Sequence, residues 1–136
     1  MVTGANVGLG YWTVQHLAAK GASVVMGCRS LDKCQEAAAA IKQTVPHAII
    51  ETLECDLTSF ASIRTFANSF LRAHASLHSL VLNAGIMMTP FGLTKDGIEQ
   101  QIGVNHFGHF LLSQLLLPRL EQTAKTAGHP TTVSVV

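Results

Sequence analysis

The chain has 136 residues, of which 48% are hydrophobic and 12% are charged, and its formal net charge at pH 7 is +1. This length suits one domain with one hydrophobic core, and the excess of apolar over charged residues excludes a disordered chain. The small net charge gives no basis for binding nucleic acid or an anionic membrane surface.

Residues 1–3 are expected to be the end of a strand, and a helix is expected over residues 9–20. Between them lies the glycine-rich turn Gly4-Ala5-Asn6-Val7-Gly8-Leu9-Gly10. Small residues at a helix N-terminus let backbone N–H groups approach a phosphate, so this segment predicts a site for the pyrophosphate of a dinucleotide. An ordinary tight turn with glycines at positive φ is the alternative.

The apolar run 22–28 is expected to be a strand buried on both faces, followed by a helix that Ser30 caps and Pro46 ends. The carboxyl end of this strand contains Arg29 and no acidic residue. An acid at this place binds the ribose 2′-hydroxyl of NAD, whereas an arginine suits the 2′-phosphate of NADP. Arg29 therefore favours NADP(H), and NAD is the less favoured cofactor. A solvated surface arginine is the alternative.

A third strand is expected over residues 48–53, followed by Asp56 and then by a helix that Thr58 or Ser59 caps. The apolar stripe of this helix comprises Ile63, Phe66, Ala67, Phe70 and Leu71. A carboxylate at the end of a parallel strand can accept a hydrogen bond from an adenine amino group. Asp56 can equally be an acid that the dipole of the following helix favours, and both roles are compatible.

A fourth strand is expected over residues 77–82 and ends at Asn83-Ala84-Gly85. Small residues at this place leave room for a flat ligand ring, and Asn83 can join neighbouring strand ends. Taken alone, the tripeptide is also typical of a common turn.

A long helix is expected over residues 96–122, and Pro118 is expected to kink or end it. Asn105 lies in its middle, although asparagine is a mediocre helix former. A structural hydrogen bond to a neighbour is the simple explanation. Residues 131–136 are expected to form one further strand.

The cysteines and histidines indicate neither a disulfide framework nor a metal site. The three cysteines, Cys28, Cys34 and Cys55, include no CxxC pair, which favours a reducing, intracellular compartment. His106 and His109 could share a helical face, but two ligands are too few for a metal site. No signal peptide is recognisable, and the most apolar stretch is too short for a transmembrane helix, although membrane association through flanking sequence stays open.

These segments together resemble the short-chain dehydrogenase/reductase family. The motifs TGANVGLG, CDL, LNAG and VNHFGHFLL stand in the order and at the spacing of that family. LNAGIMM and LTKDGIE are most similar to its retinol-dehydrogenase-like and WW-domain-oxidoreductase-like branch. The resemblance implies an α/β three-layer Rossmann fold with the strand order 3-2-1-4-5. Residues 1–136 would form a partial domain, truncated at both ends, because only Met1 and Val2 precede the first motif.

The resemblance also implies a role for each motif residue. The pyrophosphate and ribose would lie against Thr3, Gly4, Asn6, Gly8, Leu9 and Gly10. Arg29 would meet the 2′-phosphate, while Asp56 and Leu57 would flank the adenine. The adenosine ribose would contact Asn83, Ala84 and Gly85. Asn105 would be the catalytic asparagine, which holds a water that relays protons to an active-site lysine.

The activity that the resemblance implies is hydride transfer between NADP(H) and a small-molecule carbonyl/alcohol pair, on a lipophilic substrate such as a retinoid or steroid. In the family, a serine and a YxxxK segment follow the fifth strand. Tyr11 is the only tyrosine of this chain, which ends at Val136, so we expect these residues alone to be inactive.

Two other functions are weighed against this one. A truncated or degenerate family member would be a non-catalytic dinucleotide-binding or scaffold protein. A methyltransferase would leave TGANVGLG, LNAG and Asn105 as coincidences. The apolar helix around residues 100–117 is a candidate homodimer surface, and a buried core face explains its composition equally well.

Overall fold

The computed structural model describes residues 1–136 as a five-stranded parallel sheet with the strand order β3-β2-β1-β4-β5. The strands are β1 (Val2–Thr3), β2 (Val24–Cys28), β3 (Ile50–Glu54), β4 (Ser79–Leu82) and β5 (Thr132–Val135). The helices are α1 (Gly8–Ala19), α2 (Leu31–Thr44), α3 (Phe60–Ala73), α4 (Gln100–Ile102), the π-helix η1 (Gly103–Gly108) and α5 (His109–Ala127). The expected fold class and strand order are confirmed.

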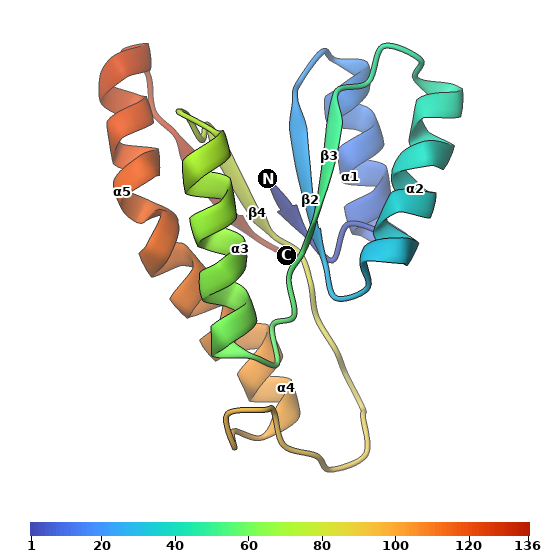
Figure 1. The fold of residues 1–136 in the computed structure, drawn as a ribbon, viewed down its shortest axis with the longest axis vertical. Coiled ribbons are helices and arrows are strands. Elements are labelled where there is room, and N and C mark those ends of the chain that lie inside the picture. The colour runs from blue at the N-terminus through green and yellow to red at the C-terminus, as the bar shows by residue number, and fades with distance from the viewer.

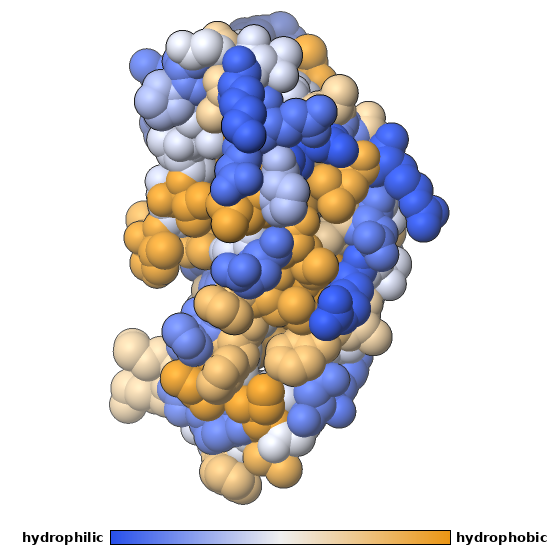
Figure 2. All heavy atoms as spheres, turned by 90° about the vertical axis from the view of Figure 1, so that its left-hand side faces the viewer, coloured by the Kyte–Doolittle hydropathy of each residue, from blue (hydrophilic) through white to orange (hydrophobic).

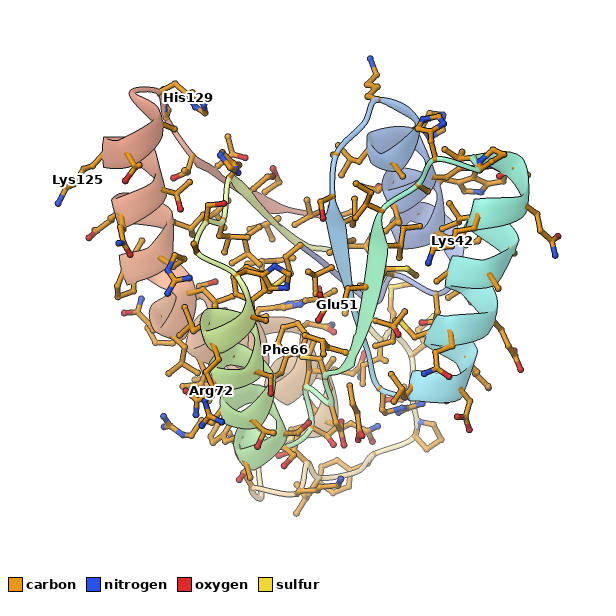
Figure 3. All side chains as sticks on the ribbon, turned by 45° about the horizontal axis from the view of Figure 1, so that its top comes forward. Lys42, Glu51, Phe66, Arg72, Lys125 and His129 are labelled. Carbon is orange, nitrogen blue, oxygen red and sulfur yellow. A yellow bond between two sulfur atoms is a disulfide. The ribbon has the colours of Figure 1, made fainter.

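The helices cover both faces of the sheet, with α1 and α2 on one side and α3 and α5 on the other (Figure 1). Each side has its own buried core. The first includes Val2, Val14, Met26, Cys34 and Ile41. The second includes Ile63, Phe66, Leu80, Leu112 and Leu116. Phe66 reaches from α3 toward the sheet (Figure 3). Neighbouring strand residues enter opposite cores, since Val25 belongs to the second core and Val24 to the first, as expected for a strand buried on both faces.

Two serine caps fix where the helices begin after β2 and β3. Ser30 accepts a hydrogen bond from the Lys33 N–H at 3.5 Å, and Ser59 accepts one from the Ser62 N–H at 3.3 Å. Both caps agree with the sequence, and Ser59 rather than Thr58 begins α3.

The long helix begins later and ends later than expected. Asp96 does not lie in it, because the Asp96 carboxylate accepts a hydrogen bond from the Phe60 N–H at 2.7 Å and so caps α3. Glu99 caps α4 instead, accepting from the N–H groups of Gln101 and Ile102 at 2.9 and 3.0 Å. The helix also continues past Pro118 as far as Ala127, where Gly128 adopts a φ of 70°.

The expectation that the cysteines are unpaired is wrong for Cys28 and Cys34, which form a disulfide (yellow bond in Figure 3). Cys28 ends β2 and Cys34 lies in the first turns of α2. Residues 29–30 turn the helix back over the strand, which brings the two Cα atoms to 5.9 Å, within disulfide reach. Cys55 is free and buried.

Hydrophobic side chains gather across the middle of the face on which α5 lies (Figure 2). Phe107, Phe110 and Leu117 are exposed there, at 42%, 58% and 41%. None of the helices combines the length and apolar character that crossing a bilayer requires.

Candidate functional site

A cleft of about 500 Å³ opens at the carboxyl ends of the strands. In a doubly wound parallel sheet this is where ligands bind, beside the point at which the strand order reverses, here between β1 and β4. The cleft is lined by Thr3, Gly4, Asn6, Val7, Leu9, Arg29, Ser30, Lys33, Cys55, Asp56, Leu57, Thr58, Asn83, Ala84, Gly85, Ile86, Val104 and Val136.

The turn between β1 and α1 carries free backbone donors at the edge of this cleft. Val7 is the N-cap of α1 and gives no side-chain hydrogen bond, and the N–H groups of Gly8, Leu9 and Gly10 have no acceptor in the protein. These N–H groups lie at the positive end of the α1 dipole. The start of α1 is therefore suited to an anionic ligand.

Glycine is required at three places in this turn. At Gly10, a Cβ atom would stand 2.5 Å from the Gly4 carbonyl oxygen and 2.5 Å from Asn83 Nδ2. Gly4 has a φ of 61°, and a Cβ atom there would stand 2.8 Å from the Ala84 Cα. Gly8 has a φ of 57°, but a Cβ atom there would meet nothing within 4 Å. Gly4 therefore allows β1 and the end of β4 to approach each other, whereas Gly8 sets only the backbone path.

Asn83 connects the end of β4 to the turn after β1. Its Nδ2 donates to the carbonyl oxygens of Thr3 and Gly4, at 2.9 and 3.2 Å. In return, the Thr3 hydroxyl oxygen accepts from the backbone N–H groups of Asn83 and Ala84, both at 3.0 Å. Asn83 thus joins the two strand ends, as the sequence suggested.

Arg29 and Lys33 stand together at the rim beyond β2. Both line the cleft, both are exposed, and neither forms an ion pair. Asp32, the nearest acid, lies inside α2 and does not line the cleft. Sequence reasoning found Arg29 but missed Lys33, although the three-residue spacing from the Ser30 cap places Lys33 in the first turn of α2.

Asp56 is 6% exposed and makes several hydrogen bonds. Its Oδ1 accepts from the Thr58 N–H at 3.0 Å and from the Thr58 hydroxyl at 2.7 Å, and its Oδ2 pairs with Lys95 Nζ at 2.9 Å. Burial by itself raises the pKa of Asp56, but the hydrogen bonds from Lys95 and Thr58 and the Lys95 charge outweigh it and lower that pKa. Asp56 is therefore an ionised carboxylate at the floor of the cleft.

Cys55 precedes Asp56 and also lines the cleft, yet it is only 4% exposed. Burial, assisted by the negative charge of Asp56, raises the pKa of the Cys55 thiol to about 12. A thiol with this pKa is not a nucleophile near neutral pH.

Asn105 lies in η1, and its side chain is hydrogen-bonded to the loop after β4. Its Oδ1 accepts from the Ile86 N–H at 2.9 Å, and its Nδ2 donates to the Ile86 carbonyl at 2.8 Å. This is the structural hydrogen bonding that the sequence left open as an explanation. Asn105 does not line the cleft, but its Oδ1 stands 3.6 Å from a Cβ atom built on Gly85, which does.

The sequence-predicted site residues converge on this one cleft, apart from three. Gly8 and Gly10 shape the turn without lining the cleft, and Asn105 stands behind Gly85. His106 and His109 are not arranged as a pair of ligands, since His109 is buried against Thr3 while His106 is exposed and stacks on Phe110. The lining residues that sequence reasoning missed are Val7, Ser30, Lys33, Cys55, Thr58, Ile86, Val104 and Val136.

Comparison with known proteins agrees with this geometry. Residues 1–135 match the family model described as short chain dehydrogenase. Retinol dehydrogenase 11 of Mus musculus is 46% identical over 124 residues, which are 91% of this chain and 39% of that protein. Retinol dehydrogenase 13 of Homo sapiens is 41% identical over 124 residues, which are 91% and 38%. The chain thus spans about two fifths of the length of these relatives.

Two solved structures have similar folds. The Pseudomonas aeruginosa RhlG/NADP active-site complex has a TM-score of 0.81 at 28% identity, covering 98% of this chain and 52% of that chain. The short-chain dehydrogenase from Sphingobium yanoikuyae in complex with NADPH has a TM-score of 0.78 at 26% identity, covering 98% and 51%.

Proposed function

Because the chain belongs to the short-chain dehydrogenase family, we propose that the full-length protein is an NADP(H)-dependent oxidoreductase that acts on a carbonyl/alcohol pair. The observation that carries this proposal is the set of unpartnered N–H groups at the start of α1, at the edge of a cleft whose far rim holds Arg29 and Lys33. A diphosphate and a 2′-phosphate are the two anionic groups of NADP, and these are the two places suited to anions.

The cleft offers a contact for each part of the cofactor. The diphosphate would lie on the N–H groups of Gly8, Leu9 and Gly10, with Thr3, Gly4 and Asn6 beside the adjoining ribose. Asp56 and Leu57 would flank the adenine, and the segment Asn83-Ala84-Gly85 would contact the adenosine ribose. When bound, NADPH supplies the hydride that reduces the carbonyl.

The preference for NADP over NAD rests on charge at the end of β2. Arg29 and Lys33 are free of carboxylate partners, and no acid stands where it would bind a ribose 2′-hydroxyl. The two similar structures named above were determined with NADP and NADPH, which supports the same choice.

Asn105 is the residue that we propose for proton relay. Its side chain is held by Ile86, and its backbone carbonyl, at the centre of η1, is the group that we propose for holding a water. By its resemblance to the family motif, this carbonyl would hold the water that passes protons to the active-site lysine.

The substrate that we propose is a lipophilic alcohol or aldehyde of the retinoid kind, because relatives 41–46% identical are retinol dehydrogenases. Activity belongs to the full-length protein. We expect residues 1–136 alone to show no turnover, since their only tyrosine, Tyr11, lies in α1 and packs against the core beneath α1 and α2.

The test is oxidation of NADPH by the purified full-length protein with retinaldehyde as the substrate. The reaction is monitored by the loss of NADPH absorbance. We expect turnover with NADPH, slower turnover with NADH, and a rise in the KM for NADPH of about tenfold or more in Arg29→Gln, which loses a charge-assisted contact to phosphate. Equal rates with both nucleotides, or no turnover with any carbonyl, would argue against the proposal.

A homodimer through the surface of α5 is a further part of this proposal. Phe110 and Leu117 are exposed on α5, and Phe107 is exposed in η1 just before it. Sedimentation of the full-length protein should give a dimer that Phe110→Glu weakens. A monomeric wild type would contradict the proposed homodimer and leave the proposed activity untouched.

A further inference from the structure

A buried chain of hydrogen bonds connects the glycine-rich turn to η1. Thr3 at the end of β1 is 1% exposed, and His109 at the start of α5 is 5% exposed. The Thr3 Oγ1 and the His109 Nε2 lie 2.9 Å apart, and the His109 Nδ1 lies 3.2 Å from the backbone oxygen of Asn105. His109 thus bridges two segments on which the proposed function depends.

The donor and the acceptor of each hydrogen bond in this series can be assigned by counting lone pairs and protons. The Thr3 hydroxyl oxygen has two lone pairs, and both accept backbone hydrogen bonds, from Asn83 and Ala84. The hydroxyl is therefore left with its proton to donate, and the His109 Nε2 must accept it. A neutral imidazole that accepts at Nε2 carries its proton on Nδ1, and this proton then points at the Asn105 carbonyl, which can only accept.

The surroundings favour the same neutral ring. Burial lowers the pKa of His109, although the hydrogen bond to the Asn105 carbonyl acts in the opposite direction. A protonated ring would present an N–H to the Thr3 hydroxyl, whose lone pairs are already occupied.

The π-helix explains why the Asn105 carbonyl accepts from a side chain. In an α-helix, the backbone N–H of His109 would donate to the carbonyl four residues earlier, which is that of Asn105. Here the His109 N–H bonds to the His106 carbonyl instead. The ring of His109 takes the place of its own backbone N–H on Asn105, while the Asn105 side chain is fixed on Ile86.

We propose that His109 is a positioning residue, whose Nδ1–H tautomer, set by Thr3, holds the backbone carbonyl of Asn105 in place beside the cofactor cleft. This role rests on the proposed function for its effect on turnover, but not for the tautomer itself. It gives the glycine-rich turn, which receives the cofactor, a direct hydrogen-bonded connection to the residue proposed for proton relay.

The first test is the tautomer of His109 in the full-length protein labelled with ¹⁵N-histidine, its ring signals being identified by their loss in His109→Gln. We expect a protonated Nδ1 and an unprotonated Nε2 near neutral pH, with or without NADPH. A ring protonated at Nε2, or at both nitrogens, would overturn the proposal. This readout needs neither cofactor nor turnover.

The second test compares His109→Asn with His109→Gln. The asparagine amide can replace the Nδ1 donor to Asn105, whereas the glutamine amide reaches the Nε2 position and can bond Thr3 only. We expect His109→Gln to lower kcat by about tenfold and to leave the Kd of NADPH within about twofold, because one hydrogen bond to a positioned group is lost. We expect His109→Asn to keep kcat within about threefold of wild type.

The matched control is His106→Gln, the same substitution at an exposed histidine of the same segment, which should leave kcat unchanged. Equal losses in His109→Asn and His109→Gln would mean that the ring serves packing alone. If the wild type binds no NADPH, the proposed function fails. The tautomer of His109 can still be measured, and it tests the assignment of the proton to Nδ1 separately. If both variants misfold, the His109 ring signals are identified in the wild type by through-bond correlation to the backbone of His109, and they still decide the proposal.

Discussion

The side-chain amide of Asn83 donates to the Thr3 carbonyl at 2.9 Å, although 80 residues separate the two in sequence. This bond, with its companion to Gly4, closes the carboxyl edge of the sheet between β1 and β4. Because β1 is only two residues long, the turn that follows it depends on contacts of this kind for its position.

Replacing Asn83 should therefore destabilise the fold. In Asn83→Ala the Thr3 and Gly4 carbonyls each lose a donor, and we expect the free energy of unfolding to fall by about 1–3 kcal/mol. Asn6→Ala is the control, since Asn6 lies in the same turn and its side chain makes no hydrogen bond; its effect should stay within about 0.5 kcal/mol. Urea denaturation of the full-length protein measures both, and equal losses would contradict this role for Asn83.

The two glycines with positive φ at the turn should differ in their tolerance of alanine. Gly8→Ala adds only backbone strain, about 1–2 kcal/mol, because its Cβ atom meets open space. Gly4→Ala adds the same strain and a clash with the Ala84 backbone, so we expect a larger loss of stability and weaker NADPH binding. Gly21→Ala, at another positive φ with open space, is the control. Similar unfolding midpoints for Gly4→Ala and Gly8→Ala would refute the close approach of β1 and β4.

His109 should make stability depend on pH. Its pKa in the folded state lies below the ordinary 6.5, mainly through burial, so the unfolded chain takes up the proton first as pH falls. Stability is therefore complete above about pH 6.5 and decreases below it, by at most about 1.4 kcal/mol per pH unit for this group. The free energy of unfolding should show this extra slope below about pH 6.5 in the wild type and lack it in His109→Phe. Parallel curves would exclude the titration.

The thiols should react unequally. Cys55 is buried and its pKa is raised to about 12, so alkylation of the native protein near neutral pH should leave it unmodified. Cys28 and Cys34 should appear as a linked pair in peptide maps made without reductant and as two alkylated cysteines after reduction and unfolding. Rapid labelling of native Cys55 would contradict its burial, and unlinked Cys28 and Cys34 peptides would contradict the disulfide.

Much of the fold and the cleft could be predicted because the signals are local. Ser30 and Ser59 stand directly before apolar stripes with helical spacing, and the glycine turn is contiguous in sequence. The parallel strands bring Arg29, Asp56 and Asn83 to one edge, because each follows the end of a strand. For such residues, the position directly after a strand already predicts the edge of the sheet at which they lie.

The features that escaped prediction depend on the path that the chain takes in three dimensions. Asp96 resembles a residue of the first helical turn, but its carboxylate caps α3 instead, from a separation of 36 residues. The sequence left a structural hydrogen bond open for Asn105, but it could not name Ile86, 19 residues away, as the partner. The pairing of Cys28 with Cys34 depends on how sharply the chain turns after β2, which residue spacing does not encode.

Binding of NADPH and NADH to the full-length protein, measured by calorimetric titration for the wild type and for Arg29→Asp, tests the central claim most directly. We expect the wild type to bind NADPH at least about tenfold more tightly than NADH, and Arg29→Asp to lose or reverse that preference, because a charge-assisted contact to the 2′-phosphate becomes a repulsion. Equal affinities in the wild type, or binding of neither nucleotide, would contradict the assignment of this cleft.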